Sequence, residues 1–274
     1  MWDSNDYSCA YDTLFSCLFD MWDEFRPLWT ERFGSLGLCS SKLAAEFDSV
    51  HGGKQALDTA RDNVRALLTR RDPQHFPRGR SLTALDRLTT SMFGANSWGV
   101  LKTMCTNCSA QHRPDGDLTC NLSVTHNNQL IDKHKTKYSL SHWLKAQRVS
   151  TGDYKCRSCE RNTVAQTVFL KAPPLLFIHL PVHAINIDAH IEVRVKDTPV
   201  PYLLRGVIYL GGNHFTARII RRNGQSWYHD GQLHGGAPVC EGNLLDQAPD
   251  YLYHHTDATC RRKAVGALYA LADI

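Results

Sequence analysis

Two Cys-x-x-Cys pairs constrain the fold of this chain more than any other feature of its sequence. Cys105 and Cys108 form the first pair, and Cys156 and Cys159 form the second. Each pair is a tight turn that can point two thiolates at one ion, and four sulfurs complete a tetrahedral zinc site. Because four thiolates leave no position open for water, the predicted zinc ion is structural and takes no part in chemistry.

Other interpretations of these cysteines compete with the zinc site. One pair could be a redox dithiol, or the spacing could arise by chance. His112 could replace one cysteine as a ligand, although a surface histidine is the simpler interpretation. Cys120 has no partner at this spacing and is predicted to be a small buried apolar side chain.

Composition narrows the class of protein. A chain of 274 residues with 42% hydrophobic content can bury a substantial core, as one large domain or two ordinary ones. The net charge of +4 comes from basic and acidic residues spread along the chain, so no basic arm for nucleic acid is expected. The sequence contains no apolar run long enough for a membrane span, and its first residues do not resemble a secretory signal. We therefore expect a soluble, intracellular protein with reduced thiols.

Helical patterns dominate the first hundred residues. Apolar residues recur at steps of three and four over 10–25, 42–49, 54–69 and 82–92, which predicts four helices. The pattern breaks near Pro73 and Pro77, because proline lacks an amide donor and fixes φ.

Strand patterns dominate the rest of the chain. Short β-like runs occur at 119–125, 164–171, 175–180, 191–195, 202–210 and 215–221. One helix is predicted within this half at 139–147. The tail at 261–274 places Val265, Leu268 and Leu271 on one side and predicts a C-terminal helix.

Cys9 is a candidate nucleophile because it begins the first predicted helix. A helix N-terminus presents unpaired N–H groups and the positive end of the helix dipole, which favour a thiolate. The polar residues before it form the kind of loop that can aim a donor at a developing oxyanion. Position alone is equally consistent with a buried structural cysteine.

His214 and Asp230 are the candidate base and its orienting group. Two glycines precede His214, a β-run follows it, and a second β-run ends at Asp230 after the turn at Asn223 and Gly224. Such a hairpin brings the carboxylate within reach of the imidazole, as a cysteine protease requires. The alternative is an ordinary solvent-facing histidine, and His183 and His229 are rival bases.

The order of these features resembles the ubiquitin-specific proteases over most of the chain. The segment NDYSCAYDTLF looks like the cysteine box of that family, and YKCRSC followed by APPLLFIHL is similar to its second zinc knuckle and the strand after it. YLLRGVIYLGGNHFTARI and WYHDG look like its histidine box. The resemblance implies an α+β, papain-like cysteine protease fold with a helical thumb (1–100), zinc-ribbon fingers (101–165) and a β-rich palm with a C-terminal helix (166–274).

The resemblance also implies the site. Cys9, His214 and Asp230 would form the catalytic triad, and the four paired cysteines would hold zinc at the fingertips. Ser4 stands where members usually carry an oxyanion-hole asparagine, so the neighbouring Asn5 is predicted for that role. Asp12 replaces a usual asparagine. These departures indicate a divergent member, with some similarity to the ubiquitin-specific-protease-like SUMO isopeptidase branch.

The implied activity is hydrolysis after the C-terminal glycine of ubiquitin by a cysteine-type deubiquitinase. The alternatives are an isopeptidase for SUMO or another ubiquitin-like modifier, and an inactive module that binds a modifier. A zinc-ribbon nucleic-acid binder is a third interpretation, which the lack of basic clusters interleaved with aromatics disfavours. The expected partners are therefore ubiquitin or a related modifier and its conjugates, with no nucleic acid and no membrane.

Overall fold

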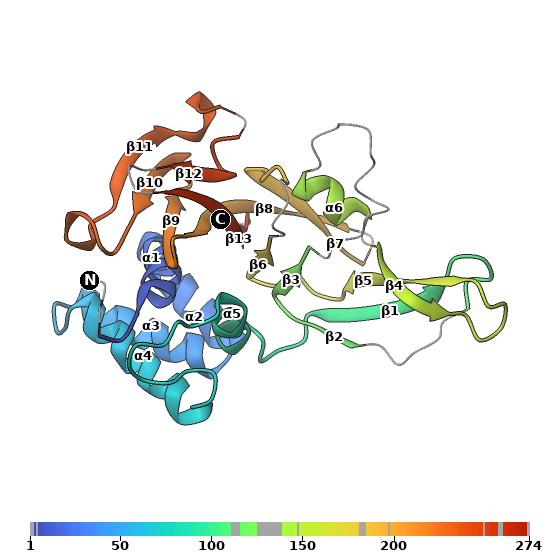
Figure 1. Cartoon of the computed structure of the whole chain (residues 1–274), viewed down its shortest axis with the longest axis horizontal. Helices are drawn as coiled ribbons and strands as arrows, with labels where there is room; N and C mark the ends of the chain where they lie inside the picture. Colours follow the sequence, from blue (N-terminus) through green and yellow to red (C-terminus); the bar gives the residue numbers. More distant parts are fainter. Residues whose placement is uncertain are drawn as a thin grey trace.

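A computed structural model of the chain describes residues 3, 5–110, 116–124, 139–146, 148–180, 185–196, 198–248, 250–256 and 260–272. Helices gather on one side of the molecule, and a large β-sheet covers them and extends away (Figure 1). Among the residues singled out from the sequence, Ser4, His112 and His183 lie outside the described ranges.

Helices make up most of the first hundred residues, as the sequence predicts. They are α1 (Cys9–Glu24), α2 (Arg26–Leu36), α3 (Leu38–His51), α4 (Leu57–Arg71) and α5 (Leu85–Phe93), with α6 (Leu140–Ala146) later in the chain. The sequence pattern did not predict α2, which buries Trp29, Phe33 and Leu36. Among the described helices, none is both long and apolar enough to cross a bilayer.

The described strands belong to one sheet. They are β1 (Gly99–Cys105), β2 (Gly116–Leu118), β3 (Asn121–Ser123), β4 (Arg148–Lys155), β5 (Asn162–Phe169), β6 (Leu175–His179), β7 (His190–Val195), β8 (Thr198–Gly211), β9 (His214–Ile220), β10 (Gln225–His229), β11 (Val239–Asn243), β12 (His254–Thr256) and β13 (Arg261–Leu271). The main order is β11-β10-β9-β8-β7-β5-β1-β2, and β13 also pairs with β8, β6 and β12.

Two apolar cores lie on opposite faces of this sheet. On β6, Leu175 and Phe177 pack into the core beneath the helices, whereas Leu176 and Ile178 pack into the second core. Successive side chains of a strand point to opposite faces, so a strand covered on both faces is apolar at every position. This explains the unbroken apolar run at 175–178.

The predicted C-terminal helix is wrong, because the segment forms strand β13. It pairs antiparallel with β8 along one edge and with β6 along the other. Leu268 and Ala270 enter the core beneath the helices, and Ala267 and Tyr269 enter the second core. A strand buried on both faces has no period of two in its sequence, and the three-residue spacing of Val265, Leu268 and Leu271 matches the period of a helix by chance.

Helix α1 packs directly against the sheet at β8 and β9. A Cβ atom at Gly206 of β8 would lie 2.8 Å from the Cys17 sulfur of α1, so only glycine permits this close approach. This approach brings α1 close to β8 where Gly206 pairs with Ile219 of β9. The division into thumb, fingers and palm at residues 100 and 165 stays a prediction.

Candidate active site

Cys9 is the first residue of α1, and its side chain is buried. The preceding Ser8 does not cap the helix with its hydroxyl, which donates instead to the Asp12 carboxylate at 2.7 Å. The N–H groups of the first helical turn have no acceptor within the helix. The thiol therefore lies beside a set of N–H donors and the positive end of the helix dipole.

A tight turn places His214. Strands β8 and β9 are joined by Gly212 and Asn213, whose φ angles are +60° and +58°. A two-residue turn with positive φ at both positions matches the twist of a hairpin, and glycine and asparagine tolerate it best. Because Gly211 pairs with His214, the histidine is the first residue of β9, where its ring is buried.

Asp230 follows the last residue of β10, the strand next to β9. His229 pairs with Ala217, so Asp230 lies opposite the start of β9. Its Oδ1 atom is 2.8 Å from Nε2 of His214 and accepts the backbone N–H of Gln232 at 2.9 Å. The contact between carboxylate and imidazole is the one expected from the hairpin.

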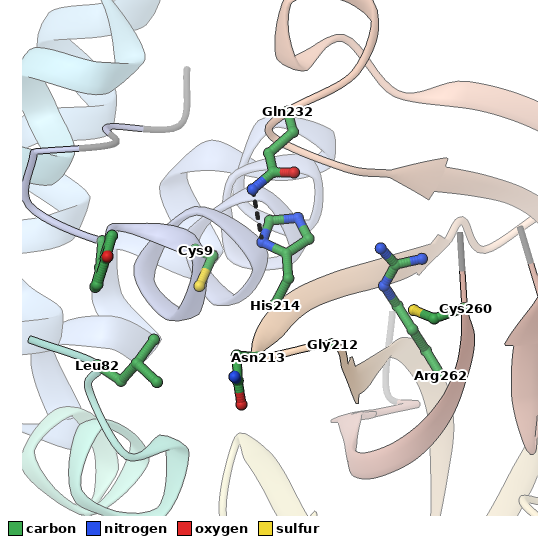
Figure 2. Close-up of a pocket in the computed structure, with 9 residues that line it drawn as sticks. Cys9, Leu82, Gly212, Asn213, His214, Gln232, Cys260 and Arg262 are labelled. Carbon is green, nitrogen blue, oxygen red and sulfur yellow. Dashed lines mark hydrogen bonds between the residues drawn. The ribbon is translucent and has the colours of Figure 1, made fainter. Parts of the chain in front are cut away.

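Cys9 and His214 line the same pocket, and the Cys9 side chain is one of the groups that raise the pKa of His214. Since Asp230 occupies Nε2, we assign Nδ1 to the side that faces Cys9. The Gln232 side-chain amide also approaches Nδ1, at 3.5 Å. Cys9 and His214 are more than two hundred positions apart in the chain, yet they lie together at one pocket (Figure 2).

Electrostatics favour a charged imidazole and a charged carboxylate here. Burial would lower the pKa of His214, but hydrogen bonds to Asp230 and Cys9, with the charges of both groups, raise it to about 9. Burial would raise the pKa of Asp230, whereas its bonds to His214 and to the Gln232 backbone, together with the charge of Arg262, lower it. The site can therefore hold a protonated imidazole bonded to an ionised carboxylate beside Cys9.

The pocket itself has a volume of about 580 Å³. Its lining comprises Tyr7, Cys9, Leu82, Gly212, Asn213, His214, Gln232, Cys260 and Arg262. Figure 2 shows Gln232 next to the imidazole and Arg262 on the side of His214 away from Cys9. The Arg262 guanidinium lies 3.9 Å from Oδ2 of Asp230.

Not every sequence-based candidate reaches the pocket. Asn5 is exposed, bonds through its backbone N–H to Asp3, and does not line the pocket, so its oxyanion role stays a prediction. The rival His229 is buried and faces Ser16 of α1 at 3.3 Å. Gln232 and Arg262 were missed, because no local pattern marks a side chain whose partner lies elsewhere in the fold.

The four paired cysteines come together at one point. Their sulfur atoms all lie within 4.8 Å of one another, and the closest pairs are Cys105 with Cys159 at 3.4 Å and Cys108 with Cys156 at 3.5 Å. Tetrahedral zinc with Zn–S bonds of about 2.3 Å needs sulfurs about 3.8 Å apart. The four thiols therefore fit a metal ion such as zinc.

Backbone N–H groups point at the sulfurs of both knuckles. Cys105 accepts from Asn107 at 3.3 Å and from Cys108 at 3.5 Å, and Cys156 accepts from Ser158 at 3.3 Å. The bond from Cys108, assisted by Asn107, lowers the pKa of Cys105 to about 6. Such bonds favour the thiolate, which is the form that binds metal. Cys120, by contrast, is fully buried in the core, as predicted.

Solved structures share this fold. The chain matches the SAGA DUB module of Ubp8, Sgf11, Sus1 and Sgf73 bound to monoubiquitin with a TM-score of 0.57 and 12% identity, over 97% of this chain and 67% of that chain. For a second Ubp8 module the TM-score is 0.55 and the identity 14%, over 98% of this chain and 68% of that chain. For a yeast SAGA module the TM-score is 0.53 and the identity 13%, over 97% of this chain and 67% of that chain. No protein-family model and no curated protein matches the sequence.

These likenesses show the fold. The mixed α+β architecture, with helices first, a large sheet and a four-cysteine cluster, matches the ubiquitin-specific protease catalytic domain of Ubp8. The predicted fold class is thus confirmed. At 12–14% identity the match carries no information about individual residues.

Replacing Asp230 with asparagine is expected to remove a pH-dependent part of the stability. The raised pKa of His214 stabilises the fold fully below about 6.5, the value for a free histidine, and this contribution is lost as the pH rises through about 9. The difference in Tm between wild type and D230N should therefore shrink between pH 6.5 and 9. Asp246→Asn, at an exposed position, serves as the control. A Tm difference that stayed constant or grew over this range would contradict the assignment.

Proposed function

We propose that this chain is a thiol-dependent isopeptidase, a deubiquitinase that hydrolyses the bond after the C-terminal glycine of ubiquitin. One observation carries the proposal: Cys9 and His214 line the same pocket, and His214 is bonded to Asp230 at 2.8 Å. A nucleophile, a base and an orienting carboxylate in this sequence of contacts are what covalent acyl transfer requires.

The reaction begins with attack by the Cys9 sulfur on the carbonyl carbon of the modifier's terminal glycine. His214 holds the proton of the thiol on the nitrogen that faces Cys9, and Asp230 fixes the ring through Nε2. The orientation matters, because the imidazole must face the nucleophile with one nitrogen while the other is bonded. The attack forms a C–S bond and a tetrahedral oxyanion.

Collapse of the oxyanion breaks the C–N bond, and His214 delivers its proton to the departing lysine amine. The product is a thioester between Cys9 and the modifier. Water then attacks this thioester, His214 accepts the proton of the water, and collapse of the second oxyanion returns the thiolate. Asp230 stays ionised throughout, as its lowered pKa favours.

Donors for the oxyanion are available on both sides of Cys9. The backbone N–H groups at the start of α1 point toward the N-terminal end of the helix, and Cys9 is its first residue. Gln232 carries an amide at the pocket, within 3.5 Å of the imidazole. We assign the oxyanion hole to these groups in preference to the exposed Asn5.

We further propose that the ion held by the four cysteines is zinc. Four thiolates suit zinc by softness and by tetrahedral geometry. Bound there, zinc would supply structure only, since no coordination position is left for water or substrate. The site would brace the loops at the ends of β1 and β4.

The modifier is tested directly with a panel of activity probes. Ubiquitin, SUMO and related modifiers carrying a C-terminal propargyl amide are incubated with the protein, because the alkyne reacts only with an activated thiolate. Labelling by the ubiquitin probe, at Cys9 in peptide mass spectra, is expected. Labelling by the SUMO probe alone would assign a SUMO isopeptidase, and binding of a modifier without labelling would assign an inactive binding module.

A further inference from the structure

Two buried arginines on α4 face the segment that carries Cys9. Arg61 and Arg65 are one helical turn apart on one side of α4, and their side chains are 5% and 0% exposed. Residues four apart on a helix share a face, so both guanidinium groups reach the same neighbouring segment. That segment comprises the turn at 5–8 and the first turn of α1.

Each arginine meets an aspartate three positions from the nucleophile. Arg61 lies 2.8 Å from Asp12, three residues after Cys9, and Arg65 lies 3.6 Å from Asp6, three residues before it. The two ion pairs therefore bracket Cys9 symmetrically. We call these four residues the arginine clamp.

Hydrogen bonds connect the clamp to the backbone on both sides of Cys9. The hydroxyl of Ser8 donates to Asp12 at 2.7 Å, accepts from Arg61 at 3.3 Å, and accepts the backbone N–H of Asp3 at 2.8 Å. The carboxylate of Asp6 accepts the backbone N–H of Gly79 at 2.6 Å. The residues before Cys9 are thus tied to α1, to α4 and to the loop after α4.

The second arginine also reaches α1 itself. The guanidinium carbon of Arg65 lies 5.0 Å from the centre of the Tyr11 ring, two residues after Cys9, a distance at which a cation and an aromatic face attract each other. Arg65 therefore touches both the turn before the nucleophile and the helix after it.

Between the two ion pairs, the backbone holds an unfavourable conformation. Tyr7 has a φ of +43°, in the left-handed region that residues with a side chain rarely adopt, and it lines the pocket next to Cys9. Such strain persists only where surrounding contacts fix the backbone, and it clusters at functional sites. Asp6 and Ser8, the neighbours of Tyr7, are the residues that the clamp holds.

Stability does not explain the clamp. Removing two ion pairs from water costs about as much as their attraction returns, and apolar side chains of similar size often stabilise a fold equally well. The same groups have further charged partners, since Asp6 also meets Arg78 at 3.3 Å and Arg61 also meets Asp62 at 2.9 Å. What the clamp supplies is a fixed position for the turn and for the start of α1.

We propose that Arg61, Arg65 and Asp6 are positioning residues for catalysis, which hold Cys9 and the Tyr7 wall of the pocket in line with His214. None of them touches the reacting atoms. The inference rests on the proposed function, because it assigns their effect to the chemical step. Misplacing a nucleophile by about 1 Å can cost about 100-fold in rate without altering the affinity for substrate.

The test uses the full chain and a ubiquitin-derived fluorogenic substrate. Asp6→Ala and Arg65→Met are expected to lower kcat about 10- to 100-fold while KM stays within about twofold. Asp6→Asn keeps an acceptor for the Gly79 N–H and should restore part of the lost rate. Asp6 and Arg65 share one ion pair, whereas Asp6 also binds Arg78 and the Gly79 N–H and Arg65 also meets Tyr11. The loss in the double variant should therefore be smaller than the product of the two single losses.

Matched controls separate position from charge and from folding. Arg70 is exposed on α4 and Asp48 is exposed on α3, so Arg70→Met and Asp48→Ala should leave kcat unchanged. If R65M does not fold, the Asp6 variants carry the test, since Asp6 is 23% exposed. Variants that keep the wild-type Tm and the wild-type kcat would overturn the proposal, and so would a rise in KM with kcat unchanged.

A second readout works without turnover. The rate at which iodoacetamide alkylates Cys9, followed by peptide mass spectrometry, should fall about tenfold in Asp6→Ala, because the thiol loses its alignment with His214. If the wild type cleaves no modifier but is still alkylated faster than Asp6→Ala, the proposed function fails and the positioning role of the clamp stands. If the wild type cleaves a modifier and the variants keep both its kcat and its rate of alkylation, the positioning role of the clamp is wrong and the proposed function stands.

Discussion

Replacing Cys9 with alanine is expected to abolish hydrolysis of ubiquitin conjugates and labelling by the propargyl probe. The alanine variant has no atom that can form the thioester, so its rate should fall by at least about 1000-fold, to what binding and oxyanion donors alone provide. Cys9 is buried at the edge of a pocket and alanine is smaller, so the fold should survive. The measurement is initial rate against a fluorogenic ubiquitin substrate, with Tm as the check on folding.

The control for this variant is another cysteine of the same chain. Cys240 is exposed on β11, outside the pocket, and Cys240→Ala should retain the wild-type rate. Hydrolysis by C9A at a rate close to wild type would end the assignment of Cys9 as nucleophile. Loss of activity in both variants would indicate a general requirement for thiols, and it would not support Cys9 in the pocket as the nucleophile.

Much of the fold was predictable because its patterns are local. The periodicity of 10–25 predicts α1, and the turn at Asn223 and Gly224 predicts the hairpin of β9 and β10. The C-terminal segment was not predictable in this way, because β13 is buried on both faces and its sequence lacks a period of two. Burial on a second face depends on elements far away in the chain, which periodicity does not report.

The residues of the site also differ in whether a local sequence pattern marks them. Cys9 and His214 could be named as candidates from the sequence, because a helix start and a turn between strands are local signals that coincide with reactive side chains. The resemblance to a protease family then favoured them over the structural alternatives. The arginines of α4 could not, since Arg61 and Arg65 have the spacing of any helix face. Only the packing of α4 against α1 shows that they meet Asp12 and Asp6.

The four-cysteine site is expected to control the stability of the strands that it joins. Cys105 ends β1, Cys156 follows β4, and these strands pair with β5 away from the helices (Figure 1). Metal binding by four thiolates contributes up to about 10–16 kcal/mol in isolated zinc-finger peptides at pH 7. We therefore expect Cys156→Ser, or removal of the metal by a chelator, to abolish protection from hydrogen exchange in 99–105 and 162–169.

The pocket should respond much less to the loss of metal, because α1 and β9 are held by a core to which none of the four cysteines belongs. The exchange of β9 amides, and the alkylation rate of Cys9, should stay close to wild type in C156S. Cys240→Ser is the matched control, and wild-type protein should carry one zinc ion per chain by elemental analysis. Two results together would contradict a structural zinc site. The purified wild-type protein would contain no metal, and Cys156→Ser would leave hydrogen exchange in 99–105 unchanged.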